Sequence, residues 1–300
     1  MNRFLTSFFA AAAVLAAAFA AEAQQVKRTQ FDVSSYLIDA QLNPIENKLT
    51  ATADVTFTPS EDTRSVTFEL NGSLKVDSVS RGDKVSAAVT PAPKGKAAAA
   101  AATPVVKPLD ITFVQDQVGV SDLGPSVRVD LGDPVVKGAT VTLRFKYSGA
   151  LNTPSGGPLL NKRLASIGPD QGYLMYAARW FPFHNYAADL ATSDITLTLP
   201  AGMQMVGYSD SPVTPTANKY HFVQSKPGLV GNFAYSKYLV KNLKFGEYSL
   251  NFYTRPGFDA NVQSFGETIG RALEFYAKSF GTPSMGKTLN VVQIDDESLD

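Results

Sequence analysis

The stretch Thr50–Phe57 reads Thr-Ala-Thr-Ala-Asp-Val-Thr-Phe, so small or apolar side chains alternate with polar ones. A period of two puts one set of side chains on a buried face and the other toward solvent, which is typical of a β-strand. The same alternation recurs in three further stretches, Ser65–Leu70, Thr140–Tyr147 and Asp194–Leu199. Turn signals rich in Gly and Pro separate such runs. The pattern predicts a mainly β protein, built as an antiparallel β-sandwich or a saddle of sheets.

The composition narrows the classes of function. The chain has 300 residues, of which 44% are hydrophobic and 18% charged, as in a globular protein. Its 27 Lys and Arg balance its 27 Asp and Glu, so we expect no nucleic-acid partner. It has no Cys and only two His, His184 and His221, which excludes thiolate sites and sites that need several imidazoles. We therefore predict that this chain holds no metal and no cofactor.

The N-terminal segment has the pattern of a targeting segment that is cleaved from the mature protein. Arg3 precedes an uncharged run from Phe4 to Ala21, and Ala21-Glu22-Ala23 forms a small-x-small cleavage pattern. This order predicts a secretory signal peptide over residues 1–23, with a membrane anchor as the alternative. The mature protein would then be secreted or periplasmic in a bacterium, without membrane association after cleavage.

The spacing of apolar residues in the remaining chain changes near Pro256, from the alternation of strands to the spacing of a helix. This change divides the chain into two parts. Residues 24–254 read as a β domain, interrupted by an Ala- and Pro-rich loop at 91–108. Beyond it, apolar side chains recur at spacings of three and four, which predicts one stripe of an amphipathic helix. These side chains are Val262, Phe265, Ile269, Leu273, Tyr276 and Phe280. A strand over 288–294 follows, so 255–300 reads as the start of an incomplete α+β domain.

Side chains capable of chemistry or of ligand contact are most concentrated between Tyr173 and Tyr186. It holds the only Trp of the chain, one of its two His, an Arg and several aromatic side chains around Pro182. One interpretation is a core strand that runs into a turn fixed by Pro. The other is a cleft rim that orients a ligand. The candidate cleft residues are Arg179, Trp180, Phe181 and His184.

Motifs for other chemistries are absent from the sequence. There is no Gly-x-Ser-x-Gly elbow, no Gly-rich phosphate loop and no His-Glu-x-x-His pair. The adjacent acids Asp295, Asp296 and Glu297 suggest a secreted acid/base hydrolase as one hypothesis. A solvated loop explains the same three residues with fewer assumptions.

The segment Ala178-Arg179-Trp180-Phe181-Pro182 resembles, with one residue fewer, the Ala-Arg-x-x-Phe-Pro segment of the aminopeptidase N family of zinc metallopeptidases, where it lies in the N-terminal β domain. Other stretches are similar to that family and occur in its order. They are Tyr36–Leu42, Leu49–Val55, Asp194–Pro200 with Val206-Gly207, Tyr235–Val240, Phe275–Gly281 and Lys287–Val292.

The resemblance implies an exported N-terminal region of such a metallopeptidase, with peptide as the substrate of a complete chain. It also implies that Arg179 to Tyr186 lie beside the cleft where the two domains meet. The family's Gly-x-Met-Glu-Asn loop and His-Glu-x-x-His helix are missing, so zinc is implied only for a complete member, and we expect these 300 residues alone to be inactive. The alternative is a non-catalytic periplasmic β-sandwich that serves as a binding or scaffolding module.

Overall fold

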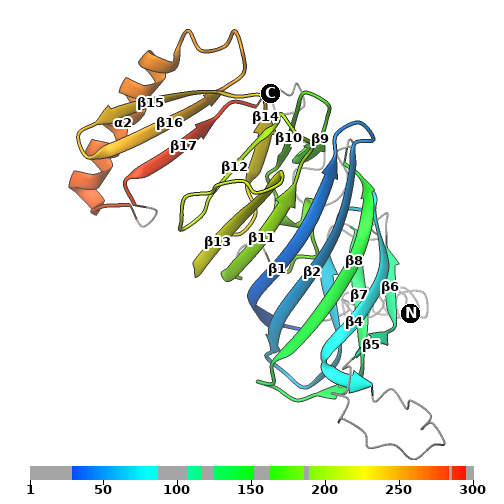
Figure 1. Cartoon of the computed structure of the whole chain (residues 1–300). Helices are drawn as coiled ribbons and strands as arrows, with labels where there is room; N and C mark the ends of the chain where they lie inside the picture. Colours follow the sequence, from blue (N-terminus) through cyan, green and yellow to red (C-terminus); the bar gives the residue numbers. More distant parts are fainter. Residues whose placement is uncertain are drawn as a thin grey trace, which may run out of the picture.

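The computed structural model describes residues 29–86, 107–116, 125–151, 163–185, 189–283 and 286–294. The predicted signal peptide, most of the 91–108 loop, Tyr186 and the acids at 295–297 lie outside these residues. The described chain is mainly β, with several antiparallel sheets and one long helix, which confirms the predicted fold class (Figure 1).

The largest element is a seven-stranded sheet with the order β13-β11-β1-β2-β8-β4-β5. In that order its strands are β13 (Lys219–Gly228), β11 (Ala191–Thr198), β1 (Phe31–Asn43), β2 (Lys48–Pro59), β8 (Val141–Ala150), β4 (Leu74–Ser86) and β5 (Lys107–Ile111). Strand β5 begins inside the loop predicted for 91–108, so the last two residues of that loop are strand. Most neighbours in this sheet are antiparallel, but β1 and β11 are parallel. The alternation of side chains could not reveal this pairing because it is the same in both kinds of sheet.

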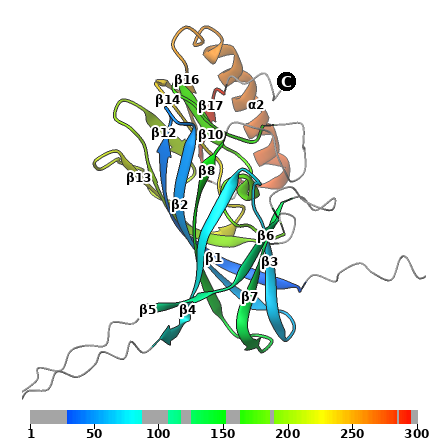
Figure 2. The ribbon, with the colours of Figure 1, turned by 90° about the vertical axis from the view of Figure 1, so that its right-hand side faces the viewer.

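A second sheet covers one face of the first and closes a β-sandwich (Figure 2). It consists of β3 (Thr63–Glu69), β7 (Ser126–Val135) and β6 (Phe113–Asp116). Phe68 of this sheet packs edge-on against Phe145 and Phe57 of the large sheet, with ring centroids 5.3 Å and 6.0 Å apart. Each such buried aromatic side chain contributes about 1.5–3 kcal/mol of hydrophobic stabilisation. We call these two sheets the sandwich.

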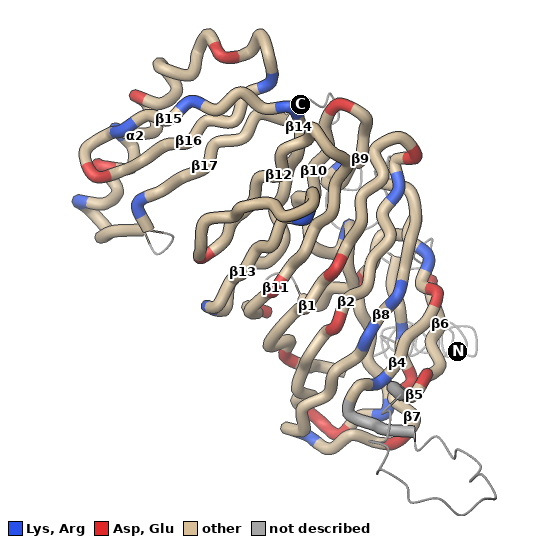
Figure 3. The backbone as a smooth tube through the Cα atoms, viewed as in Figure 1, with Lys and Arg blue, Asp and Glu red and all other residues tan. Residues whose placement is uncertain are grey.

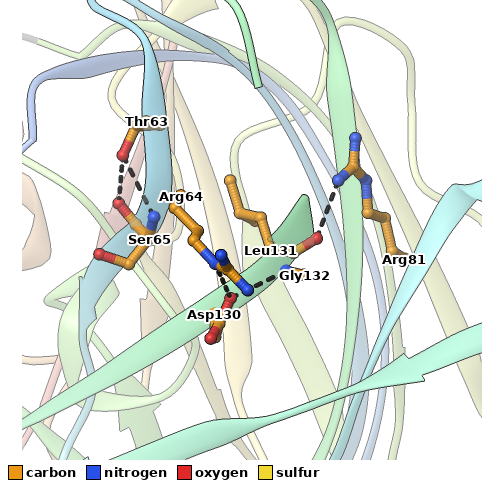
Figure 4. Close-up of polar contacts among 7 residues, drawn as sticks. All are labelled: Thr63, Arg64, Ser65, Arg81, Asp130, Leu131 and Gly132. Carbon is orange, nitrogen blue, oxygen red and sulfur yellow. Dashed lines mark hydrogen bonds and ion pairs between the residues drawn. The ribbon is translucent and has the colours of Figure 1, made fainter. Parts of the chain in front are cut away.

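Polar contacts link β7 to a strand of each sheet (Figure 4). Arg81 of β4 is buried and donates from Nη1 to the carbonyl of Leu131 in β7, at 3.0 Å. On the same strand, Asp130 accepts the backbone N–H of Gly132 at 2.9 Å and forms an ion pair with Arg64 of β3. These contacts fix the register of β7 against its neighbours.

Charged residues recur along the strands of the large sheet (Figure 3), at positions that alternate with buried ones, as the sequence pattern predicts. Asp54 of β2 lies directly opposite Arg144 of β8. The guanidinium donates to both carboxylate oxygens at 2.6 Å and 2.5 Å, and this contact raises the pKa of Arg144 above its ordinary value. Solvent screens pairs of this kind, so the outer face contributes less to stability than the inner one.

A four-stranded sheet continues from the sandwich, with the order β12-β14-β10-β9. Its strands are β12 (Gln204–Gly207), β14 (Phe233–Ser236), β10 (Gln171–Leu174) and β9 (Ala165–Ile167). All its pairings are antiparallel. The short helical turn η2 (Ala177–Arg179) follows β10.

The C-terminal part forms a unit of its own, which we call the α2 unit (Figure 1). It contains β15 (Leu239–Phe245), β16 (Tyr248–Thr254), α2 (Val262–Phe280) and β17 (Thr288–Val292). The sequence predicted the helix and the last strand. The hairpin β15–β16, which the sequence analysis placed with 24–254, pairs with β17 and packs against α2 instead. The boundary at residue 254 was drawn from periodicity alone, whereas sheet pairing groups 239–254 with the helix.

The predicted apolar stripe of α2 divides between the core and the surface. Val262, Ile269 and Leu273 contact the sheet, whereas Phe265, Tyr276 and Phe280 are 61%, 56% and 81% exposed. The reason is that α2 lies on the sheet through its glycines. A Cβ built on Gly266 would lie 2.4 Å from Leu243, and one built on Gly270 would lie 2.3 Å from Phe245. The helix approaches where side chains are absent, and the larger aromatic side chains lie on its flank.

No helix in the described ranges is long and apolar enough to cross a membrane.

Candidate functional site

The aromatic segment Tyr173–Asn185 runs from the four-stranded sheet back into the sandwich. It leaves β10, turns through η2 and forms a short antiparallel bridge between Phe183 and Glu69, with both backbone hydrogen bonds made. Asn71 supports the turn, since its backbone N–H donates to the carbonyl of Ala178 and its side-chain amide donates to the carbonyl of Arg179. The segment is therefore fixed at both ends.

Trp180 lies in the core where the segment meets the four-stranded sheet. Its side chain is 0% exposed, and its indole Nε1 donates to the carbonyl of Gly231 at 3.3 Å. The ring packs edge-on against Phe181 and Phe233, with centroids 4.7 Å and 5.8 Å away. Gly231 has a φ of +100°, and a Cβ there would lie 3.1–3.2 Å from the rings of Phe181 and Trp180. Only glycine satisfies both requirements without strain.

Phe181 and Arg179 are also buried. Phe181 is 0% exposed and packs edge-on against Tyr36 of β1, with ring centroids 5.0 Å apart. Arg179 is 2% exposed, and burial lowers its pKa from the ordinary value, while nearby Tyr176 acts in the opposite direction. A guanidinium at such a position stays ionised because its ordinary pKa is so high. These side chains line the interior of the fold.

His184 forms a buried pair with Asp189. Its Nδ1 lies 2.6 Å from Oδ2 of Asp189, and the two side chains are 12% and 5% exposed. The imidazole stacks on Phe31 at a centroid distance of 3.7 Å, which connects the start of β1 to the segment. The hydroxyl of Tyr36 is buried nearby, and burial, followed by the negative charge of Asp189, raises its pKa well above the ordinary value. The partner of His184, Asp189, was not identified from the sequence.

The structure thus places Trp180 and Phe181 in one aromatic cluster, whereas His184 stacks on Phe31 and pairs with Asp189. Trp180 and Phe181 touch each other, Phe181 packs against Phe183, and His184 follows directly in the chain. Arg179 lies beside them in the same turn. Their burial favours the core interpretation over the cleft rim. A role at a substrate cleft stays a prediction for these four residues.

One hollow lies next to this cluster, and a second, larger hollow adjoins the first. The smaller one encloses about 340 Å³, and its lining includes Gly231 and Phe233, which both contact Trp180 from the other side. The larger one encloses about 700 Å³ between β12, the loop Tyr208–Pro215 and the face of the α2 unit that points away from the helix. Tyr208 and Phe222 line both hollows. We call the larger hollow the inter-sheet cleft.

The walls of the inter-sheet cleft carry amides and hydroxyls that sequence reasoning missed. Asn251 of β16 and Asn290 of β17 lie directly opposite each other, and Nδ2 of Asn251 donates to Oδ1 of Asn290 at 3.0 Å. Each stands between apolar neighbours, in Leu250-Asn251-Phe252 and Leu289-Asn290-Val291. That alternation marks both as outward-facing strand residues. It does not reveal that they pair, because 39 residues separate them.

Among the described residues that line this cleft, Asp210 is the only carboxylate, and its oxygens are already engaged. It accepts hydrogen bonds from the backbone N–H and hydroxyl of Ser225 and from the hydroxyl of Tyr208, and these lower its pKa below the ordinary value. Lys287, the only cationic residue of the lining, pairs with Glu247. The cleft is therefore polar without an unbalanced charge.

The described residues do not fit a zinc site. Across the described ranges, no three His, Asp or Glu side chains converge as ligands. Each histidine pairs with one aspartate, His184 with Asp189 and His221 with Asp194. Zinc sites in proteins need three or four such donors around one point.

Comparison with known proteins gives a fold but no sequence family. No protein-family model and no curated protein sequence matches the chain. Among solved structures, the M1 zinc metallopeptidase from Deinococcus radiodurans is similar, with a TM-score of 0.63, 17% identity and 89% of this chain covered. A mutant of it bound to a Tyr-Ser-Ala substrate gives a TM-score of 0.59 and 16% identity over 88% of the chain. A two-domain M1 zinc metallopeptidase mutant bound to L-arginine gives a TM-score of 0.63 and 17% identity.

The chain spans little more than half of these structures, 56–58% of their length. At 16–17% identity the likeness is one of fold alone. Nearly all of this chain therefore shares its fold with part of the M1 zinc metallopeptidases.

Proposed function

We propose that this chain forms the β-rich, non-catalytic part of an exported zinc metallopeptidase that acts on peptides. The observation that carries the proposal is the likeness of fold to M1 zinc metallopeptidases over 88–89% of the chain, one of them holding a Tyr-Ser-Ala substrate. The loose resemblance of the Ala178–Pro182 segment to the aminopeptidase N family supports it independently.

In this proposal the hydrolytic groups come from sequence outside these 300 residues. The printed sequence contains no His-Glu-x-x-His and no Gly-x-Met-Glu-Asn motif, and the described residues offer no zinc ligand set. The contribution of this chain is to bind and orient. Its buried aromatic cluster supports the wall of the smaller hollow, because Trp180 holds Gly231 and Phe233 from behind.

The test compares two polypeptides. Residues 24–300 alone, incubated with zinc and with alanyl-, arginyl- and tyrosyl-p-nitroanilide, should show no turnover. The same chain expressed together with whatever the reading frame encodes beyond codon 300 should hydrolyse at least one of these amides, and a chelator should abolish the activity. Robust chelator-sensitive turnover by residues 24–300 alone would contradict the assignment of roles.

A binding or scaffolding module is the second candidate. It is favoured by one observation, namely that Arg179, Trp180 and Phe181 are buried in the core, which gives them a structural role without any catalytic partner. A stop codon directly after codon 300 would support this candidate, and a frame that encodes both catalytic motifs would reject it.

Export is part of the proposal and has its own measurement. Mass spectrometry of the protein recovered from the periplasmic or culture fraction should find Gln24 as the first residue. An intact Arg3 in that fraction would contradict cleavage after residue 23.

A further inference from the structure

The smaller hollow is lined by the large sheet and by the loop 229–232, which leads into β14. Ser193 of β11 and Phe222 of β13 line it from the buried face of the large sheet, and Leu229, Gly231 and Asn232 line it from the loop. Its volume of about 340 Å³ is at the lower end of the range of about 300–1,000 Å³ that is usual for ligand sites. A ligand that fits is therefore compact, such as an aromatic ring with a short chain.

Aromatic side chains form the apolar part of the lining. Phe222 and Phe233 pack edge-on with ring centroids 4.8 Å apart and are 2% and 6% exposed. Trp180 packs against Phe233 from the other side, so the position of this wall is fixed. Aromatic rings attract a further ring that lies edge-on or offset against them, which favours a ligand with an aromatic body.

The hydroxyl of Ser193 supplies independent evidence for a polar ligand group. Ser193 is 8% exposed and lines the hollow, yet its hydroxyl makes no hydrogen bond with any residue in the described ranges. Buried hydroxyls in folded proteins are nearly always hydrogen-bonded, because leaving one unpaired is costly. An acceptor oxygen of a ligand in the hollow would be its partner.

The loop 229–232 carries further donors. Across the described parts of the chain, none of its four backbone N–H groups donates to another residue. The carbonyl of Gly231, by contrast, accepts the indole N–H of Trp180, which holds the loop against the core. Gly231 itself has a φ of +100°. Backbone N–H groups exposed by a turn of this kind commonly bind an anion.

The charge of the lining has the sign that an anion requires. Lys226 is the only charged side chain among the described residues that line the hollow, and no described carboxylate forms an ion pair with it. Its charge acts on Asp210, which does not line the hollow, and contributes least to the lowered pKa of that carboxyl. The ammonium group of a lysine attracts an anion as a point charge and repels a cation.

We infer that the smaller hollow binds a small aryl carboxylate. The ring of the ligand lies against Phe222 and Phe233. Its carboxylate faces Lys226 and accepts hydrogen bonds from the hydroxyl of Ser193 and from the N–H groups of the loop 229–232. The inference is independent of the proposed peptidase role, because this ligand has neither a peptide bond nor an amino group.

The experiment uses the full chain near neutral pH and 3-phenylpropionate as the probe. Calorimetry measures the affinity, and NMR shifts of the amides at 229–232 report the place of binding. We expect a Kd below about 1 mM, which is a modest affinity for a ligand of this size. The uncharged analogue 3-phenylpropanamide keeps the ring and should bind at least tenfold more weakly. Octanoate keeps the carboxylate without the ring and should also bind at least tenfold more weakly.

L-Phenylalanine distinguishes this site from a site for peptides or for products of their hydrolysis. It is 3-phenylpropionate with an added ammonium group next to the carboxylate. Lys226 repels that group, so we expect L-phenylalanine to bind at least tenfold more weakly than 3-phenylpropionate.

Protein variants test the two polar side chains of the hollow. Lys226→Gln should weaken binding of 3-phenylpropionate about tenfold, and Ser193→Ala about fivefold. Lys219→Gln on the same strand as Lys226, and Ser35→Ala on β1, remove the same groups outside the lining and should leave the affinity unchanged. Circular dichroism and a urea transition for each variant establish that it is folded.

Several outcomes overturn the inference. These are no binding of 3-phenylpropionate, equal binding of the amide or of octanoate, equal weakening by the control variants, and shifts confined to amides outside the lining. Equal or tighter binding of L-phenylalanine would assign the hollow to amino acids and would also overturn it. No measurement here involves hydrolysis, so failure leaves the test of peptidase activity unaffected, and the reverse also holds.

Discussion

The sandwich and the α2 unit are built from strands of the same alternating pattern, but they bury their side chains to different extents. In the sandwich, Val55, Leu143 and Phe145 are 0% exposed because the second sheet, continued by the aromatic segment, covers the inner face. In the α2 unit a single helix covers the sheet, and Phe275 and Phe280 on that helix remain 63% and 81% exposed. A sheet and the segment beside it cover several neighbouring strands, whereas one helix covers only a strip of its sheet.

The largest expected effect of a substitution is in the aromatic cluster that joins the sandwich to the four-stranded sheet. Trp180→Ala should lower the free energy of unfolding by about 3–5 kcal/mol, because it removes a fully buried aromatic ring and leaves a cavity. The matched control, Tyr276→Ala on the exposed side of α2, should cost less than about 0.5 kcal/mol. Urea denaturation of both variants measures the difference. A loss below about 1 kcal/mol for Trp180→Ala would favour the cleft-rim interpretation instead.

The contact between α2 and its sheet can be tested through a glycine. Gly→Ala in an exposed helix stabilises a protein by up to about 1 kcal/mol. Gly270→Ala should instead destabilise it by about 1–3 kcal/mol, because the added Cβ would lie 2.3 Å from the ring of Phe245. Ser279→Ala, at an exposed position of the same helix, serves as the control and should be close to neutral. A stabilised Gly270→Ala variant would mean that the helix does not lie closely on the sheet in solution.

The outer face of the sandwich should be less sensitive than its inner face. Asp54→Asn removes the carboxylate that pairs with Arg144 and should cost about 0.2–1 kcal/mol, with a smaller cost at high salt. A double-mutant cycle with Arg144→Met isolates the pair. The prediction is contradicted if the coupling energy of the pair equals the loss of unfolding free energy caused by Trp180→Ala. In that case the charged outer face would contribute much of the stability of the sandwich.

The smallest expected effect is on the pH dependence of stability. It comes from Asp210 in the loop Tyr208–Pro215. Hydrogen bonds from Ser225 and Tyr208 depress the pKa of Asp210 in the folded state. The resulting stabilisation is present above the ordinary aspartate pKa of about 4 and is lost as the pH falls through the lower pKa of the folded state. Asp210→Asn should therefore flatten the pH dependence of the urea midpoint between about pH 5 and pH 2. An NMR titration of the Asp210 carboxyl should give a midpoint below the ordinary value, and an ordinary midpoint would contradict the hydrogen bonds.

The candidate site was only partly accessible from the sequence. The concentration of aromatic side chains between Tyr173 and Tyr186 led the sequence analysis to name Arg179, Trp180, Phe181 and His184 as candidate cleft residues. Whether they face a core or a cleft could not be predicted, because Trp, Phe and Arg suit both environments. The partners that determine their environment, Phe31 for His184 and Gly231 for Trp180, come from distant parts of the chain.

The sequence by itself determined that its alternating runs form strands and which side of those strands is buried. In β2, Ala53, Val55 and Phe57 point inward as the alternation of Thr50–Phe57 predicts, because a strand turns successive side chains to opposite faces wherever it lies. Only the tertiary structure decided the partners: the parallel pairing of β1 with β11, the union of β15–β16 with α2, and the meeting of Asn251 with Asn290. The physical reason is that alternation is a relation between residues two apart, whereas pairing and coverage depend on surfaces that the chain brings together only after folding.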